Sequence, residues 1–379
     1  MDKNLNIENN NIDNRTDIIN ENNAKLNNEN KTITSSKIDN TKVIEVENKG
    51  ELESLEDLPF ETQIDYKKQS WKVALAPHLR TKNTTQRVML DVIIALLPQL
   101  FYSIYIFGYN ALVLTLISVI SCVFFEAITQ KAFKKPILIY DLSAVVTGML
   151  LAFNIPANAP WWLPIVGSLF AIVFVKEFFG GIGSNFVNPA LAGRAILMLS
   201  WPAIMTNYIG PDGITGATPL QILKGSEGIL PSLKDMFFGN IGGVLGETSA
   251  FFLLIGFLYL VIRKVVDYKI TIIYILSTMV VLFGLGVRDT NLLYHLLGGG
   301  LILGACFMAT DYATAPISNL GKVIYAVLCG VLTALIRLKG GMPEGVSYSI
   351  LILNICVPLI DRLTIPRVFG EVKKHARKS

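Results

Sequence analysis

The feature that most constrains this chain is a series of about ten apolar segments separated by short polar connections. An α-helix needs roughly 20 residues to cross the hydrocarbon core of a bilayer, and most segments are close to that length. We therefore expect an all-α polytopic membrane protein with about ten transmembrane helices. Several segments are barely long enough, so some helices should be tilted, broken or re-entrant. The segments are 92–107, 111–128, 137–153, 161–178, 187–204, 244–262, 270–286, 292–309, 323–338 and 346–363.

Composition separates the membrane part of the chain from its ends. Only 16% of the residues are charged, against about 25% in soluble proteins. Residues 1–70 are rich in Asn, Glu, Asp and Lys and cannot bury enough apolar surface to offset the cost of ordering, so we expect a disordered cytoplasmic tail. Residues 71–370 are predicted to form the membrane domain, with an outward loop near 205–240. Residues 371–379 form a basic cytoplasmic tail, and the net charge of +4 gives no reason to expect nucleic-acid binding.

The basic residues predict the orientation of the helices. Cytoplasmic connections carry an excess of Lys and Arg, and ten alternating spans place four basic clusters on one side. Both termini are then cytoplasmic, and the loop between the fifth and sixth segments is outside. Because each half has five spans, the halves would run in opposite directions, as in inverted repeats. The clusters are Lys72–Arg87, Lys131–Lys135, Arg263–Lys269 and Arg362–Lys378.

Acidic residues at membrane depth are candidates for an ion path, because burying a charge in hydrocarbon costs about 2.5–3.5 kcal/mol. Asp141 and Asp311 are the preferred candidates, since each lies beside hydroxyls and small residues. The alternative is that these acids reach the interface or cap helices. No His, Cys and acid pattern has metal-ligand spacing, so no metal site is predicted. The full set of acids is Glu126, Asp141, Glu177, Glu247 and Asp311.

Two further polar or glycine-rich features lie within the apolar segments. Asn188 followed by Pro189 is typical of a helix start. Arg194 then lies one to two turns into the fifth segment, where a phosphate or carboxylate would suit it; a buried Arg–Asp or Arg–Glu pair is the alternative. The run Gly298–Gly300 would allow close approach of a flat ring or, more commonly, of another helix.

The loop Asp212-Gly213-Ile214-Thr215-Gly216-Ala217-Thr218-Pro219-Leu220 is the most specific local signal. Its glycines permit unusual backbone angles, and Pro219 delays the start of a helix, so two threonines are offered on a deformable backbone. A simple turn is the alternative reading. The string resembles the D-G-x-[S/T]-G-A-T recognition sequence of proteins that carry FMN on threonine through a phosphoester bond. That resemblance implies that Thr218 bears the flavin.

A resemblance also extends from about Ala76 to Gly370. It includes Met89–Pro98, Ala159–Pro164, Asn188–Ala190, Gly246–Ala250, Met308–Asp311, Pro343–Ser347 and Pro366–Gly370. The chain resembles the D subunit of the Rnf complex, the ion-translocating ferredoxin:NAD oxidoreductase. It is less closely similar to the B subunit of the sodium-pumping NADH:quinone oxidoreductase.

The resemblance implies an electron-carrying subunit in a bacterial inner (cytoplasmic) membrane, with an inverted five-plus-five fold like that of urea transporters. FMN would be attached to Thr218 from FAD by a flavin transferase that recognises Asp212, Thr215, Gly216 and Ala217, and non-covalent riboflavin would also be bound. Electron flow between ferredoxin and NAD, through partner subunits, would move Na⁺ or H⁺. The alternatives are a quinone-linked pump subunit and a urea-transporter-like channel without a redox role.

Overall fold

The structure is a computed structural model and describes residues 84–365 apart from 211, 214 and 289. The predicted disordered segment 1–70 and the basic tail 371–379 lie outside the described residues. Within the described part of the chain, the regular elements are helices, accompanied by two isolated β-bridges. The predicted all-α fold class is confirmed.

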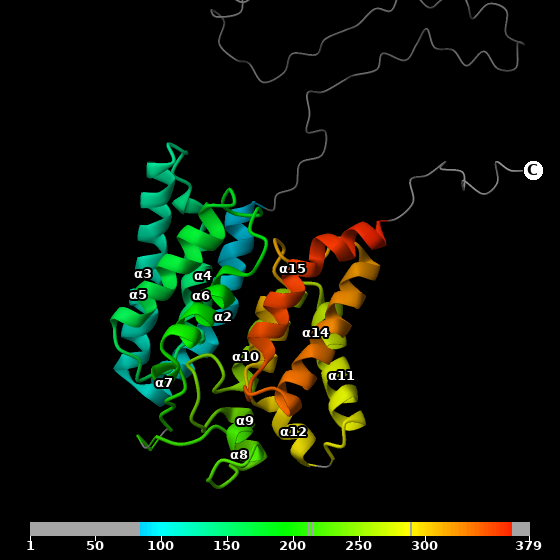
Figure 1. The fold of residues 1–379 in the computed structure, drawn as a ribbon. Coiled ribbons are helices and arrows are strands. Elements are labelled where there is room, and N and C mark those ends of the chain that lie inside the picture. The colour runs from blue at the N-terminus through cyan, green and yellow to red at the C-terminus, as the bar shows by residue number, and fades with distance from the viewer. Residues whose placement is uncertain (1–83, 211, 214, 289, 366–379) are drawn as a thin grey trace, which may run out of the picture. The chain divides into compact units, whose positions relative to one another are not determined.

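The first half of the domain starts with two long helices and continues with shorter ones (Figure 1). The long helices α2 (Thr85–Phe107) and α3 (Tyr109–Ala132) are joined at Gly108. The following elements are η3 (Ile139–Asp141), α4 (Ser143–Phe153), α5 (Trp162–Leu169) with its π-helical continuation η4 (Phe170–Glu177), α6 (Pro189–Ser200) and α7 (Pro202–Met205).

A long polar connection with two short helices leads to the second half. These helices are α8 (Pro219–Leu223) and α9 (Leu233–Phe238). The second half consists of α10 (Ala250–Ile262), α11 (Tyr268–Gly284), α12 (Thr290–Leu297), α13 (Leu301–Leu303) with its π-helical continuation η5 (Gly304–Met308), α14 (Asn319–Lys339) and α15 (Val346–Thr364).

Each predicted segment contains a helix, but the helices differ in length. Four of them, α2, α3, α14 and α15, are long and apolar enough to cross a membrane, and a fifth span results if the pair bent by 51° around residues 298–300 is counted as one. Others are much shorter. With 11 residues, α4 rises only about 16 Å at 1.5 Å per residue, which is roughly half of the ~30 Å hydrocarbon core.

Two predicted segments are helical only in their later parts. The segment 137–153 is interrupted at Leu142, whose φ of 63° separates η3 from α4. The segment 244–262 becomes helical only at Ala250. Its first residues instead bond to the end of α4, where Gly246 N donates to Phe153 O at 2.8 Å. Bonds to another part of the chain therefore replace the expected first helical turn.

The two halves pack their helices in a similar order. In the first half α3 packs against α4 and α5, and α6 packs against α4 and α5. In the second half α11 packs against η5 and α14, and α15 packs against η5 and α14. Between the halves, α2 packs against α10 and α6 against α15. The first helix of one half thus packs against the first helix of the other, and the fifth against the fifth. This arrangement agrees with two five-helix repeats related by a two-fold axis.

Small residues allow the halves to approach closely. A Cβ atom added at Gly256 of α10 would overlap the carbonyl oxygen of Ala95 in α2. Membrane helices use such small residues to bring backbones together, because packing rather than hydrophobicity drives their association. Gly256 therefore sets the distance between the first helices of the two halves.

The basic connections and the Thr218 segment lie at opposite ends of the domain. Figure 1 shows the start of α2 and the end of α15 at one end, and α7, α8 and α9 at the other. Arg263, which follows α10, lies at the first end because its Nη2 is 3.2 Å from Oδ2 of Asp91 in α2. The segment that contains Thr218 and these basic residues are thus separated by the length of the helices.

Candidate functional site

The segment before α8 is a small turn that displays the predicted recognition sequence. Ile209 and Thr215 form an antiparallel bridge, and Gly216 N donates to Tyr208 O at 3.1 Å. Gly213, with φ of 74°, lies in the reversal, a conformation that a side chain would strain. The turn thereby holds the recognition residues in one place relative to Tyr208.

Burial changes abruptly along the recognition sequence. Asp212, Thr215 and Gly216 are exposed and Ala217 is half-buried. Thr218, the predicted attachment residue, is only 8% exposed. The structure therefore exposes Asp212, Thr215 and Gly216 to solvent, whereas Thr218 packs against the domain.

Thr218 is the N-cap of α8. Its Oγ accepts a hydrogen bond from Gln221 N at 3.4 Å, and Gln221 Oε1 accepts one from Thr218 N at 2.8 Å. This reciprocal capping box satisfies two backbone donors that the first turn would leave free. Pro219 occupies the first helical position, so the helix does not start before this residue, as expected.

A small recess connects Thr218 with a group of charged side chains. Its walls come from α8, from the connection before α10 and from the break after α12. Two acids, Glu247 and Glu344, reach it from different connections. The lining residues are Thr218, Pro219, Ile241, Gly242, Gly243, Glu247, Gly298, Gly299 and Glu344.

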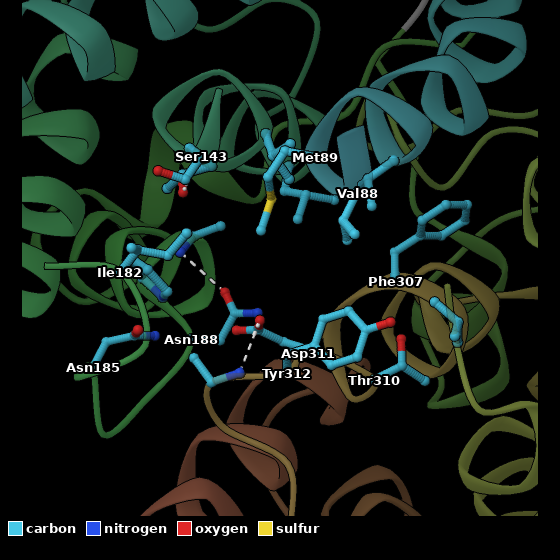
Figure 2. Close-up of a pocket in the computed structure, with 18 of the residues that line it drawn as sticks. Val88, Met89, Ser143, Ile182, Asn185, Asn188, Phe307, Thr310, Asp311 and Tyr312 are labelled. Carbon is cyan, nitrogen blue, oxygen red and sulfur yellow. Dashed lines mark hydrogen bonds between the residues drawn. The ribbon is translucent and has the colours of Figure 1, made fainter. Parts of the chain in front are cut away.

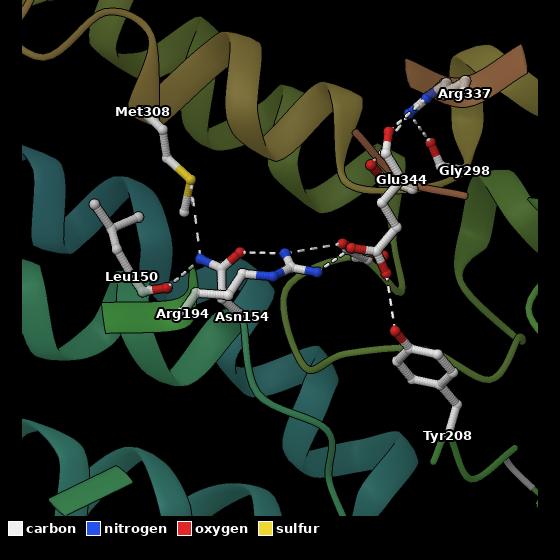
Figure 3. A network of polar contacts seen from close by, with 10 residues as sticks. Leu150, Asn154, Arg194, Tyr208, Gly298, Met308, Arg337 and Glu344 are labelled. Atoms are coloured by element: carbon white, nitrogen blue, oxygen red, sulfur yellow. Dashed lines mark hydrogen bonds and ion pairs between the residues drawn. The ribbon is translucent and has the colours of Figure 1, made fainter. Parts of the chain in front are cut away.

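Arg194 is the centre of this charged group (Figure 3). Its Nη1 donates to Asn154 Oδ1 at 2.6 Å and lies 3.5 Å from Glu247 Oε1, while its Nη2 pairs with Glu344 Oε2. Two roles were considered for Arg194, contact with a phosphate or carboxylate ligand and a buried pair with an acid. The structure shows the buried pair. A charge this deeply buried needs such partners, because removing it from water is costly.

The start of α6 places Arg194, as the Asn-Pro pair predicts. The Asn188 side chain accepts from the amides of Ala190 and Leu191 at 3.1 and 3.3 Å, and Pro189 is the first helical residue. This cap fixes the residue at which α6 begins, and therefore the position of the Arg194 guanidinium group along the helix.

Tyr208 connects the recognition turn to the charged group. Its hydroxyl donates to Glu344 Oε1 at 2.9 Å. Burial raises the pKa of Tyr208 above its ordinary value, and the negative charge of Glu344 raises it further. The phenol therefore remains protonated and keeps its role as a donor.

A second buried arginine holds the break between α12 and α13. Arg337 Nε donates to Glu344 O at 2.8 Å, and Nη2 donates to Gly298 O and Gly299 O at 3.0 and 3.1 Å. Its Nη1 donates to His295 O. These bonds satisfy carbonyl groups that the end of α12 leaves without helical partners.

The glycine run forms a helix break and also allows the close approach of another helix, which is the packing role that we expected. Gly299 and Gly300 have φ of 65° and 66°. A Cβ atom at Gly299 would overlap Leu220 Cδ1, and one at Gly300 would lie 2.6 Å from Glu247 Oε1. The run is therefore needed both for its backbone angles and for the close approach of α8 and Glu247.

A cavity of about 490 Å³ lies on the other side of Glu344. Lys224, at the end of α8, closes part of it by donating to Gly340 O and Met342 O at 2.5 and 2.9 Å. Burial lowers the pKa of Lys224. The lining residues come from α6, α7, α8, α15 and the connections that follow α7 and α8 and precede α15. They are Arg194, Ala195, Met198, Pro202, Thr206, Tyr208, Gln221, Lys224, Ser226, Gly341, Met342, Pro343, Glu344, Gly345, Ser347 and Tyr348.

Three of the predicted ion-path acids meet at the opposite end of the domain, around Lys176. Its Nζ lies 2.5 Å from Glu126 Oε1 and donates to Ser143 Oγ at 2.6 Å, and Ser143 Oγ donates to Asp141 Oδ1 at 2.7 Å. Glu177 joins through Gln130, whose Nε2 donates to both glutamates. We call these six residues the inner cluster: Glu126, Gln130, Asp141, Ser143, Lys176 and Glu177.

Asp311 lies beside the inner cluster at a cavity of about 100 Å³ (Figure 2). Its carboxylate accepts from Ala313 N at 3.4 Å and from Thr314 Oγ at 3.3 Å. Ser143 and Lys176 also line this cavity. Glu247, in contrast, belongs to the group around Arg194 at the other end. Among the described residues, no group of three or more His, Cys, Asp or Glu side chains could hold a metal ion.

Sequence reasoning missed three residues that organise these groups. Glu344 lies in a connection, whereas the candidate acids were those of the apolar segments. Lys176 interrupts an apolar segment beside Glu177. A lysine at such a position indicates a buried ion pair and could have been recognised from the sequence. Tyr208 gave no local signal, because its role depends on a contact with a residue 136 positions away.

Together, the fold and the site define a polytopic helical membrane protein with two similar five-helix halves and a displayed threonine loop supported by buried ion pairs. Residues 72–370 match the family described as NQR2, RnfD, RnfE. The chain belongs to this family.

This chain aligns with similar proteins over almost their whole length. The chain is 51% identical to the D subunit of the Na⁺-translocating ferredoxin:NAD⁺ oxidoreductase complex of Acetobacterium woodii, over 80% of this chain and 98% of the relative. It is 39% identical to the D subunit of the proton-translocating ferredoxin:NAD⁺ oxidoreductase complex of Clostridium ljungdahlii, over 80% and 97%. It is 35% identical to the D subunit of the ion-translocating oxidoreductase complex of Stutzerimonas stutzeri, over 76% and 93%.

Proposed function

We propose that this chain is the D subunit of an ion-translocating ferredoxin:NAD⁺ oxidoreductase complex and carries FMN covalently on Thr218. The names of the relatives support the complex and its remaining subunits as partners. The observation that carries the flavin assignment is the turn before α8, which exposes Asp212, Thr215 and Gly216 and ends at Thr218.

The surroundings of Thr218 fit a phosphoester. In the described structure its Oγ accepts a hydrogen bond from Gln221 N and donates none. Esterification therefore removes no hydrogen-bond donor that the fold uses. A flavin transferase would join Oγ to the flavin-side phosphorus of FAD. The bond between the two phosphates breaks, AMP leaves with the electron pair, and the hydroxyl proton passes to a base.

Bound FMN would supply one- and two-electron transfer chemistry. The chain's own residues position it. The capping box fixes the Thr218 backbone, Gly299 allows α8 to lie against the helix break, and Tyr208 holds the turn to Glu344. Arg194 contacts the carboxyl groups of both Glu247 and Glu344, and Arg337 donates to the backbone oxygen of Glu344, so two guanidinium groups hold the connections that carry these acids.

We further propose that the chain lies in a bacterial cytoplasmic membrane with both termini cytoplasmic and the Thr218 loop outside, and that it also binds non-covalent riboflavin. The basic connections at the end opposite Thr218 support this orientation. The inner cluster and Asp311 would then face the cytoplasm. Since the relatives include sodium- and proton-translocating complexes, Na⁺ or H⁺ would be the ion that these residues conduct.

The test is production of the chain with its flavin transferase, followed by in-gel flavin fluorescence and mass spectrometry of the Thr218 peptide. We expect fluorescence that survives denaturation and an FMN-sized mass on Thr218. Thr218→Val should abolish both. Thr206→Val, a nearby threonine outside the recognition sequence, should retain them. Covalent flavin in the Thr218→Val protein would contradict the assignment.

The quinone-linked pump subunit is the second candidate, because the family description includes NQR2. Purification with neighbouring subunits separates the two. Reduction of NAD⁺ by reduced ferredoxin supports the first function, whereas quinone reduction by NADH supports the second. A chain without covalent flavin, from cells that contain the transferase, would favour the channel without a redox role.

A further inference from the structure

The end of α3 has a lysine at a position where helices usually have glycine. Lys134 N donates to Lys131 O at 3.1 Å, and Lys135 N donates to Gln130 O at 2.9 Å. In this type of helix end the residue after the cap has a left-handed backbone, and it is usually glycine. Here that residue is Lys134, with φ of 56°. A strained backbone that carries a charged side chain points to a use for the charge.

The positive charges at this helix end are not neutralised by the protein. Within the described residues, no acid forms an ion pair with any of the three lysines. The nearest acids along the chain, Glu126 and Asp141, are bonded within the inner cluster instead. The surface therefore favours an anionic ligand. The three exposed lysines are Lys131, Lys134 and Lys135.

A row of phenylalanine rings leads away from the lysines along η4. The ring centroids of Phe170 and Phe174 are 5.1 Å apart, and those of Phe174 and Phe178 are 5.2 Å apart. Phe178 lies 5.9 Å from Phe133, and Lys135 Nζ lies 5.5 Å from the centre of the Phe133 ring. Phe133, Phe174 and Phe178 are 45%, 44% and 56% exposed. The row is a continuous apolar surface that ends beneath a positive charge.

The length of α3 places the lysines at the level of lipid headgroups. Its 24 residues rise about 36 Å at 1.5 Å per residue, which exceeds the ~30 Å hydrocarbon core. The last turn, which carries Lys131, therefore reaches the headgroup layer, and the phenylalanine row on η4 extends back toward the hydrocarbon. Aromatic rings and lysines are typical of this boundary, and clustered lysines attract anionic lipids.

From these observations we propose that Lys131, Lys134 and Lys135 bind the phosphate group of an anionic phospholipid. An acyl chain of the same lipid lies along the phenylalanine row from Phe133 to Phe170. A free phosphate ion would leave this row without a contact, and a soluble acidic protein would not reach the part of the row within the hydrocarbon. The lipid site does not depend on the proposed flavin attachment.

The test is lipid binding by the full chain, purified in detergent and titrated with phosphatidylglycerol or with phosphatidylcholine. Native mass spectrometry gives the number of bound lipids and the affinity, and thermal unfolding gives the stabilisation. We expect the wild type to bind phosphatidylglycerol more tightly than phosphatidylcholine. Inorganic phosphate at the same concentration should not reproduce the stabilisation.

Lys134→Gly separates binding from folding, because it removes a charge and also relieves the left-handed backbone. We expect an equal or higher thermal midpoint without lipid, but an affinity for phosphatidylglycerol that is lower by about fivefold. Replacing all three lysines by glutamine should lower the affinity by more than about tenfold. The control removes three exposed cations near α9, α12 and the end of α14 and should keep the affinity: Lys234→Gln, Arg288→Gln and Lys339→Gln.

Phe174→Gln tests the acyl-chain part of the site. It places a polar group in the middle of the phenylalanine row, so we expect a several-fold weaker affinity for phosphatidylglycerol. Phe283→Gln is the control, because Phe283 of α11 is 48% exposed and lies outside the row. A Phe174→Gln protein with the affinity of the wild type overturns the place of the acyl chain.

Three further outcomes overturn the lipid site. One is equal affinity of the wild type for the two lipids, and another is unchanged affinity in the Lys134→Gly protein. Equal stabilisation by inorganic phosphate and phosphatidylglycerol would show that the lysines bind a free anion. If the triple glutamine variant keeps its affinity for phosphatidylglycerol but loses a partner subunit from the assembled complex, the surface is a subunit contact and the proposal is wrong.

Discussion

The hydroxyl of Tyr208 lies 2.9 Å from Glu344 Oε1 and joins the turn before Thr218 to the connection between α14 and α15. Glu344 also pairs with Arg194 of α6. One carboxylate therefore ties together the recognition turn, the fifth helix of the first half and the fifth helix of the second. The turn is displayed at the surface, but its position is set by a buried contact between the halves.

Tyr208→Phe tests how firmly the turn is held. The change removes one hydrogen bond to a carboxylate, and such bonds contribute about 1.5–3 kcal/mol. We expect a lower thermal midpoint in detergent and faster limited proteolysis within the turn. Tyr312→Phe is the matched control, since Tyr312 is 63% exposed. Equal proteolysis rates in the two variants would show that the contact does not restrain the turn.

Arg194→Met should be among the most destabilising substitutions. It leaves Glu247 and Glu344 buried without their nearest cation. Removing one partner of a buried pair costs about 3–5 kcal/mol. Glu344→Gln should also destabilise, but the double variant should lose less than the sum of the two. Thermal unfolding of all four proteins gives the coupling, and strict additivity would argue against the pair.

Gly299→Ala should displace α8 from the helix break. The added methyl group would meet Leu220 and Arg337, and the left-handed backbone alone costs a side chain roughly 1–2 kcal/mol. Gly284→Ala is the control, because its Cβ atom would meet nothing within 4 Å. We expect Gly299→Ala to lower both the thermal midpoint and the yield of covalent flavin. Unchanged values would mean that α8 moves aside without consequence.

Asp311→Asn and Asp141→Asn test the predicted ion path. In the assembled complex we expect each to reduce turnover that depends on Na⁺ or on the proton gradient, because each removes a charge near the inner cluster. Asp267→Asn, which breaks a half-exposed pair with Lys322, controls for loss of a carboxylate elsewhere. If ion-dependent turnover is the same in all three variants as in the wild type, these aspartates are not on the path.

Lys176→Met tests whether the inner cluster depends on its cation. The lysine and Glu126 are 3% and 1% exposed, so the substitution buries an unpaired carboxylate. We expect a loss of thermal stability that Glu126→Gln in the same protein partly restores. Lys322→Met, at a much more exposed pair, should have a small effect. A loss in the double variant equal to the sum of the single losses would rule out direct pairing.

Much of the fold follows from local sequence. Apolar length located the helices, and Asn188 with Pro189 gave the start of α6 because capping is decided within a few residues. The breaks at Leu142 and Gly298–Gly300 were not located, since their backbone angles are fixed by contacts with other parts of the chain. For the same reason, apolar length overstated the helices α4 and α10.

The candidate site was predictable only in part. Thr218 could be singled out as the predicted flavin site because the recognition sequence is contiguous. The partners of Arg194 were left open between a ligand and an acid, and the acid Glu344 is 150 residues away. Pairings over such separations depend on how the two halves meet, which periodicity and spacing within a segment do not encode.

The capping role of Thr218 has a consequence for maturation. The oxygen that would receive the flavin is the oxygen that closes the first turn of α8, and Thr218 as a whole is only 8% exposed. If Thr218 is the attachment residue, we expect the flavin transferase to act on a form in which that turn is open. A helix of five residues has little stability of its own, so opening its first turn requires little free energy. On the proposed assignment, the rate of cofactor loading is limited by a local unfolding equilibrium, and a substitution that over-stabilises α8 would yield a well-folded chain that stays colourless.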